Sequence, residues 1–134
     1  MQRTNAPRAM KLQPDKSDVQ SISGYGPGWV AVDAEKITHS VILSSRGERI
    51  AWPAQRFEDL GAEHFELLAR VDAEVVIFGS GSRIRFPQAA WLKPLMAKRI
   101  GIETMDTAAA CRTYNILAQE GRSVAVALLL EQPG

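Results

Sequence analysis

Hydrophobic and polar residues change their spacing along this chain near Pro53. Before Pro53 the apolar residues fall in short alternating runs. These runs predict strands over 19–23, 29–32, 37–43 and 49–52. Turn-forming residues separate them, including a Gly-Tyr-Gly-Pro-Gly cluster at 24–28 and Ser-Arg-Gly-Glu at 45–48. The first third of the chain is therefore predicted to be an antiparallel β-meander.

After Pro53 helical spacing alternates with continuous apolar runs. The two patterns predict helices over 62–70, 88–98 and 107–119, and strands over 75–78, 100–105 and 123–130. The run Val75–Phe78 is apolar at every position, which is typical of a strand buried on both faces. Pro94 is the seventh residue of the second helix, so this helix either kinks there or begins closer to Pro94. Asp106 or Thr107 is expected to cap the third helix.

Helices that alternate with apolar strands favour an α/β core with a partly parallel sheet. The β-rich start must add antiparallel strands or a second small sheet, which predicts a three-layer architecture. Residues 1–18 are polar, contain proline and show no periodicity, so they are predicted to be a flexible tail. The remainder, residues 19–131, suits a single domain.

Composition narrows the class of protein. Of the 16 bases and 15 acids in 134 residues, residues 1–20 hold four bases and two acids, which leaves a nearly neutral body. A nucleic-acid binder usually shows a concentrated basic face, so we expect no nucleic-acid partner. The single cysteine favours a reducing compartment. The longest apolar run, 124–130, is far shorter than the roughly 20 residues of a membrane span, so a soluble cytoplasmic protein is expected.

The segment Gly79-Ser80-Gly81-Ser82-Arg83 is the first candidate site. It follows a buried strand, and ligands of open α/β sheets bind at the carboxyl ends of strands. Its glycines would let backbone amides approach a phosphate. The segment lacks the third glycine of a dinucleotide fingerprint and the lysine of a P-loop. A tight turn that needs positive φ angles is therefore the alternative.

The second candidate is the helix start from Asp106 through Thr107 to Cys111. Its amides form the positive end of a helix dipole, which suits an anion. If the two preceding strands are neighbours, this helix start and the Gly79–Arg83 loop share one rim of the sheet. Arg83 and Arg85 would then complete an anion pocket. The alternative is that Asp106 or Thr107 is a cap and the three alanines between them and Cys111 serve packing.

Cys111 lies one turn into the helix, where the dipole could lower the pKa of its thiol. A nucleophilic cysteine also needs a base within reach, and the sequence does not place His39 or His64 near Cys111. Ala110 and Tyr114 share a core-facing stripe with Cys111 at its edge. We therefore favour a small buried side chain over a nucleophile.

A polar ridge on the opposite side of this helix contains Arg112, Asn115 and Gln119. Such a ridge is usually solvated, but it is also a candidate partner surface, together with Trp52. For Trp52, core packing is the default. Two histidines, one cysteine and scattered carboxylates make no spaced ligand set, so no metal is expected. No catalytic residue is identified.

Three segments resemble the Mth938-like family, which is also known as a domain of unknown function. They are VILSSRGERIAWP (41–53), EVVIFGSGSRIRFP (74–87) and GIETMDTAAACRTYNILAQEGRSVAVALLL (101–130). The third is the most specific, since its MDT, AACRTYN and EGR pieces have the family's order and spacing. The positions that match the most typical motifs are Gly79, Gly81, Pro87, Asp106, Thr107, Cys111, Tyr114, Asn115 and Arg122.

The resemblance implies a three-layer α/β fold: a central mixed β-sheet with helices on one face and an additional antiparallel β layer. No enzymatic activity or cofactor is established for the family, so the resemblance carries over no catalytic residue and supplies no role for any single position. Mitochondrial members of the family are assembly factors for respiratory complex I that work through protein partners. The leading hypothesis is thus a non-enzymatic protein-binding or assembly module. The alternative is a small-molecule or anion-binding protein, including an unrecognised enzyme, with a pocket between the Gly79–Arg83 loop and the Asp106–Cys111 helix start.

Overall fold

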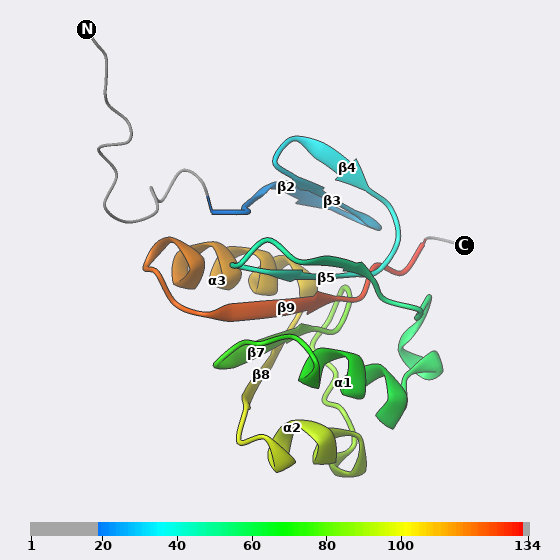
Figure 1. Ribbon diagram of the computed structural model, residues 1–134. Coiled ribbons are helices and arrows are strands. Elements are labelled where there is room, and N and C mark those ends of the chain that lie inside the picture. Colours follow the sequence, from blue (N-terminus) through cyan, green and yellow to red (C-terminus); the bar gives the residue numbers. More distant parts are fainter. Residues whose placement is uncertain (1–18, 133–134) are drawn as a thin grey trace, which may run out of the picture.

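The computed structural model describes residues 19–132, so the tail predicted over 1–18 lies outside the described residues (Figure 1). The strands are β2 (Ile22–Gly26), β3 (Trp29–Val32), β4 (Glu35–Ile37), β5 (Val41–Ser44), β6 (Arg49–Ala51), β7 (Val75–Gly79), β8 (Gly101–Met105) and β9 (Val124–Leu128). The helices are α1 (Ala62–Ala69), α2 (Lys93–Ala97) and α3 (Thr107–Gln119), with 3₁₀ turns η3 (Phe57–Asp59) and η4 (Ala89–Leu92).

The strands form two sheets. The central sheet has the order β6-β5-β9-β7-β8, and the small sheet has the order β2-β3-β4. In the central sheet β7 runs parallel to both β8 and β9, whereas β5 runs antiparallel to β6 and β9. The central sheet is therefore mixed and the small sheet is wholly antiparallel. The predicted architecture, a central mixed sheet with an additional antiparallel β layer, is confirmed.

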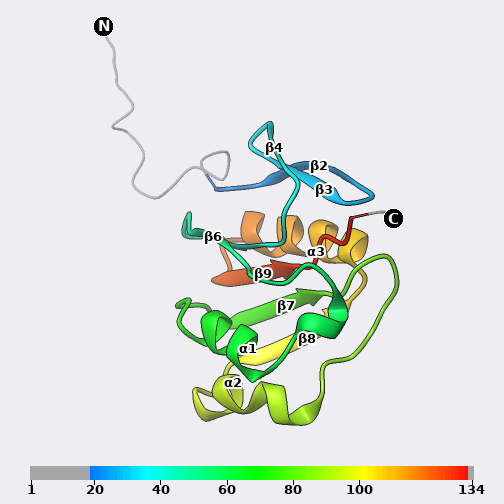
Figure 2. The ribbon, with the colours of Figure 1, turned by 90° about the vertical axis from the view of Figure 1, so that its right-hand side faces the viewer.

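Helices cover both faces of the central sheet, rather than the single face that was expected. Helix α3 and the small sheet lie on one face, and α1 and α2 lie on the other (Figures 1 and 2). The connection from β7 to β8 moves outward to the edge of the sheet, and the connection from β8 to β9 moves back past β7. Right-handed crossovers that run in opposite directions place their helices on opposite faces, which explains the position of α2 and α3.

Two hydrophobic cores result, because side chains of the buried strands point alternately to either face. Ile77 of β7 packs with α3 and the small sheet in what we call the α3 core. Phe78, its neighbour, packs with α1 and α2 in what we call the aromatic core. Strands β7 and β9 are buried nearly throughout, as their continuous apolar runs predict.

The predicted meander is divided between the two sheets. The single strand expected over 37–43 is two strands, because the chain passes from the small sheet to the central sheet at 38–40. There the Ser40 hydroxyl accepts a hydrogen bond from the Leu130 amide (2.9 Å). The turn expected over 24–28 is shorter, since Gly24 and Gly26 belong to β2. The Trp29 ring lies against Gly26, in space that any Cβ there would need.

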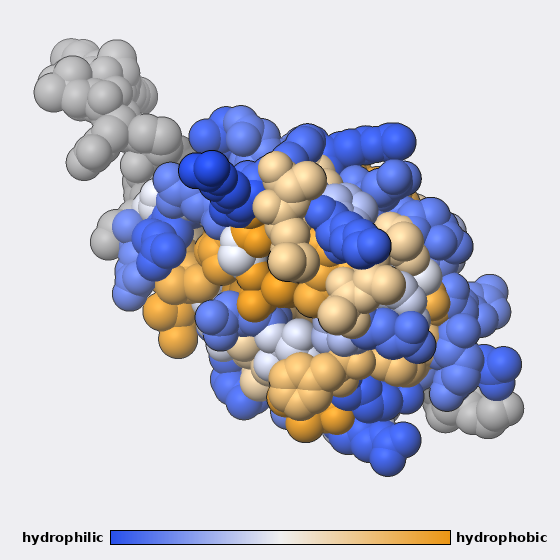
Figure 3. Space-filling view, turned by 90° about the horizontal axis from the view of Figure 1, so that it is seen from below, coloured by the Kyte–Doolittle hydropathy of each residue, from blue (hydrophilic) through white to orange (hydrophobic). Residues whose placement is uncertain are grey.

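The chain between β7 and β8 is irregular before it becomes helical. The helix predicted over 88–98 is a 3₁₀ turn followed by α2, and Pro94 is the second residue of α2. A proline is tolerated in the first helical turn, where its missing N–H would have no partner. The helix thus begins close to Pro94. Figure 3 views the molecule from the side on which α2 and the β8 edge lie.

Candidate functional site

The two segments predicted to share a rim meet at Thr107. The Thr107 hydroxyl accepts a hydrogen bond from the Gly81 amide (2.8 Å) and donates one to the Leu129 carbonyl (3.1 Å). The Thr107 amide in turn donates to the Gly81 carbonyl (2.8 Å). Thr107 therefore ties the start of α3 to the loop after β7 and to the end of β9. The predicted juxtaposition of these two segments is confirmed.

Local chemistry explains why α3 begins here. Asp106 is the residue before the helix, and its carboxylate accepts a hydrogen bond from the Ala109 amide (2.8 Å). Such a cap satisfies an amide that has no partner within the helix. Gly79 lets the helix approach the sheet, because a Cβ on Gly79 would lie 2.9 Å from the Ala110 Cβ. Gly81 has a φ of 106°, a conformation that side chains rarely adopt.

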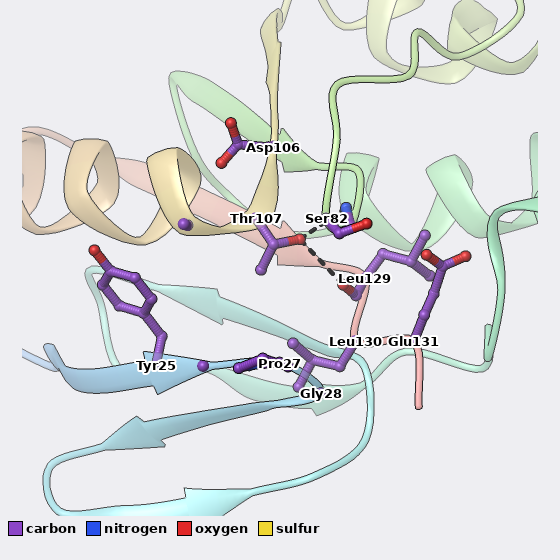
Figure 4. A pocket seen from close by; sticks show the side chains of 12 residues that line it. Tyr25, Pro27, Gly28, Ser82, Asp106, Thr107, Leu129, Leu130 and Glu131 are labelled. Carbon is purple, nitrogen blue, oxygen red and sulfur yellow. Dashed lines mark hydrogen bonds between the residues drawn. The ribbon is translucent and has the colours of Figure 1, made fainter. Parts of the chain in front are cut away.

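A pocket of about 350 Å³ opens beside this junction (Figure 4). Its walls are the β2–β3 turn, the loop after β7, the first turn of α3 and the end of β9. The lining residues are Tyr25, Gly26, Pro27, Gly28, Gly81, Ser82, Asp106, Thr107, Ala108, Leu129, Leu130 and Glu131. The small sheet thus supplies a wall that the sequence did not predict. The turn cluster at 24–28 was the available signal, but nothing local indicates that it packs beside α3.

The electrostatics of this pocket differ from those of the predicted anion site. Its lining, within the described chain, includes the carboxylates of Asp106 and Glu131 but no Lys, Arg or His. Arg83 is exposed and is not part of the lining. Arg85 is not part of the lining either, because its guanidinium donates to the Ser80 carbonyl (2.6 Å) and pairs with the lining residue Glu131 (2.6 Å). The lining therefore suits an apolar or uncharged group better than an anion.

Ser80 and Arg85 hold the loop after β7 in place. Ser80 is fully buried, and its hydroxyl donates to the Arg83 carbonyl (2.8 Å) and accepts from the Arg85 amide (2.8 Å). The Arg85 guanidinium also lies over the Phe57 ring, 4.8 Å from its centroid. Its partner Glu131 accepts a hydrogen bond from the Phe57 amide (2.9 Å). These contacts assign Ser80 and Arg85 a structural role in shaping the rim.

Cys111 is fully buried in the α3 core and is not part of the pocket lining. Burial raises the pKa of its thiol from 9.0 to about 12, and the nearby Arg112 opposes this only in part. The thiol is therefore protonated at neutral pH. The interpretation of Cys111 as a small buried side chain is confirmed, and the dipole of α3 does not make it a thiolate.

The polar ridge of α3 serves contacts within the chain. The Asn115 side chain accepts a hydrogen bond from the Ile22 amide (2.9 Å) and donates one to the Ile22 carbonyl (2.8 Å). These two hydrogen bonds hold β2 against α3. Arg112 is exposed, and its guanidinium donates to the Tyr25 hydroxyl (2.9 Å). Sequence reasoning missed the pairing of Asn115, because its partner lies 93 residues away.

Trp52 packs in the core, which was the default for it, and so it does not belong to an exposed partner surface. Trp52 is 2% exposed, and its indole N–H donates to the His64 carbonyl (3.0 Å). Its ring makes edge contacts with those of Phe65 and Phe78, at centroid distances of 5.9 Å each. The chain turns after β6 so that this side chain points under α1. Buried tryptophans usually find a partner for the N–H, as Trp52 does.

Other site chemistry is sparse in the described chain. Residues 19–132 hold no group of three His, Cys, Asp or Glu side chains placed to bind a metal. No helix in the same part is long and apolar enough to cross a membrane. A second hollow, of about 810 Å³, lies beside the junction of β6 and η3, where His39, Arg56 and Asp59 contribute polar groups. These groups form no nucleophile-and-base arrangement.

Fold and site together define a small α/β domain with an apolar pocket and no assembled catalytic group among its described residues. Residues 22–129 match the family described as "Protein of unknown function (DUF498/DUF598)", and the chain belongs to this family. A Bordetella pertussis protein described as a Mth938-like domain has the same fold, with a TM-score of 0.79 and 31% identity over 93% of this chain and 95% of that chain. The resemblance to Mth938-like proteins is thus confirmed.

Two further relatives extend the comparison. The crystal structure of a Bordetella parapertussis protein matches with a TM-score of 0.79 and 37% identity, covering 84% of this chain and 97% of that one. The Bos taurus protein named NADH dehydrogenase (ubiquinone) 1 alpha subcomplex assembly factor 3 is 33% identical over 129 residues. That alignment covers 95% of this chain and 69% of the bovine protein.

Proposed function

We propose that this protein is a non-enzymatic module that binds a protein partner and assists the assembly of a larger complex. The observation that carries the proposal is the 33% identity, over 95% of this chain, to a bovine protein named as an assembly factor of an NADH dehydrogenase. A human relative with the same name is 28% identical over 129 residues. Identity at this level supports a shared way of acting through protein partners.

The chemistry of the described residues supports the same proposal. The one thiol of residues 19–132 is buried and protonated, and its environment holds no base that could activate it. The buried hydroxyls of Ser80 and Tyr114 and the half-buried amide of Asn115 have hydrogen-bond partners within the chain, so these groups are engaged in holding the fold.

Affinity capture tests the proposal. The full chain, tagged at one end, is expressed in its source cells and recovered under mild conditions, next to a tagged protein of similar size and charge. We expect at least one protein in near-stoichiometric amount with this chain and absent from the control. Its co-migration with the chain in size-exclusion chromatography identifies a complex. If the chain is recovered alone and elutes as free protein from its own cells, the proposal fails.

The second candidate function, ligand binding, is supported by the pocket between the β2–β3 turn and α3. Its lining favours an uncharged ligand over the phosphate that the sequence suggested. Titration with inorganic phosphate should therefore leave the amide signals of Gly81 and Thr107 unchanged in a ¹⁵N spectrum. Shifts of those two signals at millimolar phosphate would revive the anion site.

A further inference from the structure

Positive charge is concentrated in one part of the described chain. Residues 75–102 contain five Arg or Lys and no Asp or Glu, whereas the rest of residues 19–132 contains seven bases and thirteen acids. The basic segment includes β7, η4 and α2 and reaches into β8, the edge strand of the central sheet. Arg85 pairs with Glu131, and the other four bases of the segment are exposed: Arg83, Lys93, Lys98 and Arg99.

The same segment exposes large apolar side chains. Phe86 is 69% exposed, Met96 is 67% exposed and Ile84 is 50% exposed. They are three of the six exposed large apolar side chains in residues 19–132. Seen from below, apolar side chains gather in the middle of the face that carries α2 and β8, and hydrophilic side chains surround them (Figure 3). An apolar centre with a charged rim is typical of a surface that binds another molecule.

The sheet edge on this side is open. Strand β8 pairs with β7 along Gly101–Met105, and no strand of residues 19–132 pairs with its other side. Alternate backbone N–H and C=O groups of β8 therefore point outward. Glu103, near the middle of the strand, is exposed. An open edge of this length accepts an extended peptide as an added strand, which pairs through its main chain.

We propose that an extended, acidic segment of a protein partner binds along the outer edge of β8. Its main chain adds a strand to the sheet, its apolar side chains cover Phe86 and Met96, and its carboxylates face Arg83, Lys93 and Arg99. This inference rests on the proposed function, since it names the surface and the partner chemistry by which the module binds. An acidic peptide fits better than an anionic bilayer, because a bilayer offers no strand pairing for the open edge of β8.

Site-specific photo-cross-linking tests the location. Full-length chain carrying p-benzoylphenylalanine at position 103 is expressed in source cells, and the matched control carries it at position 50. Ile50 is a suitable control because it is exposed on β6, the opposite edge strand. We expect an adduct from position 103 and none from position 50. Mass spectrometry should map the cross-linked site to a segment rich in Asp or Glu and in apolar residues.

Charge reversal tests the chemistry. The double variant Arg83→Glu/Lys93→Glu should weaken binding of the synthetic cross-linked peptide at least tenfold in fluorescence anisotropy. Both side chains are exposed, and Lys93 is the first residue of α2, where a glutamate complements the helix dipole, so the variant should fold. Arg122→Glu, a reversal at an exposed residue outside the basic segment, should leave the affinity unchanged. Binding should also weaken as salt is raised.

Several outcomes would overturn the inference. An adduct between two copies of this chain would make β8 a dimer edge. The face would be assigned to a membrane if the wild type co-sediments with phosphatidylserine vesicles, the double variant does not, and no protein adduct forms. A stoichiometric partner that is captured equally by wild type and the double variant, with no adduct at position 103, would disprove this surface and leave the proposed function standing. Failure to capture any partner would refute both.

Discussion

The two faces of the central sheet are covered in different ways. On the α3 face, side chains bond to distant backbone: Tyr114 donates to the Gln20 carbonyl (2.7 Å), and Asn115 binds both polar backbone groups of Ile22. On the opposite face the contacts are aromatic, with the Phe78 ring 5.4 Å from that of Phe65 and 5.9 Å from that of Trp52. Both faces bury an apolar core, to which the α3 face adds hydrogen bonds from side chains to distant backbone and the opposite face adds contacts between aromatic rings.

This difference has a consequence for binding. Directional bonds occupy the polar groups of α3 and leave a small pocket at its start. On the opposite face Phe86 and Met96 are exposed, and α2, which carries Met96, contacts the open edge strand β8. A partner that covers exposed apolar side chains gains hydrophobic free energy, which needs no directional bonds. Partner binding is therefore expected beside α2 and β8.

The largest effect is expected from Phe78→Ala. Removing a fully buried aromatic ring from the aromatic core should lower the free energy of unfolding by about 3 to 5 kcal/mol. Urea denaturation measures the change. Phe86→Ala is the matched control, since its ring is 69% exposed and its loss should change stability by less than about 0.5 kcal/mol. Equal losses in the two variants would mean that Phe78 is not a centre of this core.

The pH dependence of stability should reveal Cys111. In the unfolded chain its thiol loses its proton near pH 9, whereas in the folded chain burial holds the pKa near 12. Between these values the unfolded state binds fewer protons, so stability is fully present below pH 9 and falls as pH rises. The slope from this group is about 1.4 kcal/mol per pH unit.

The variant Cys111→Ala lacks this titration and should show a shallower loss of stability between about pH 9 and 11. Subtracting the slope of the variant from the slope of the wild type cancels the contributions of tyrosines and lysines, because both proteins share them. Parallel slopes for the two proteins would contradict the burial of the thiol. As a second measurement, Cys111 should resist iodoacetamide at about pH 7.5 in the native state and react in urea.

Gly79→Ala should disturb the approach of α3 to β7. The added Cβ would lie 2.9 Å from the Ala110 Cβ and 3.1 Å from the Thr107 Cα, so the helix must shift. We expect a loss of about 1 to 3 kcal/mol in the free energy of unfolding. Gly101→Ala is the control, because no other atom lies within 4 Å of the place that its new Cβ would take. A Gly79→Ala protein as stable as the wild type would show that α3 is less tightly docked than these distances require.

The smallest effect is expected from Asn115→Ala. It leaves the Ile22 amide and carbonyl without their side-chain partners, at the edge of β2. Because the site is half-buried, water replaces part of the loss, and a change of about 1 kcal/mol is expected. Hydrogen exchange at Ile22 should quicken, whereas the exposed Gln119→Ala on the same helix should leave it unchanged. An unchanged exchange rate at Ile22 in Asn115→Ala would contradict the role of Asn115 in holding β2 against α3.

Sequence reasoning reached the fold where the pattern is local. The continuous run Val75–Phe78 identified a buried strand, and Asp106 identified a helix start whose cap is present. The meeting of Gly81 and Thr107 follows from the sequence only on the condition that β7 and β8 are neighbours, and the tertiary structure supplies that condition. The placement of helices on both faces was not predicted, because it depends on the strand order β9-β7-β8, which sends α2 and α3 to opposite faces. No local spacing encodes this order.

The sequence by itself determined most of the secondary structure, the buried strands and the cap at the start of α3, because spacing, caps and glycines act over a few residues. Tertiary structure decided the rest. It buried Trp52 under α1, paired the Asn115 side chain with the backbone of β2, and paired Arg85 with Glu131 instead of leaving it free to bind an anion. These outcomes depend on partners far away along the chain, whose positions are set when the two cores pack, and the partner of Arg85, Glu131, is itself a residue of the pocket lining.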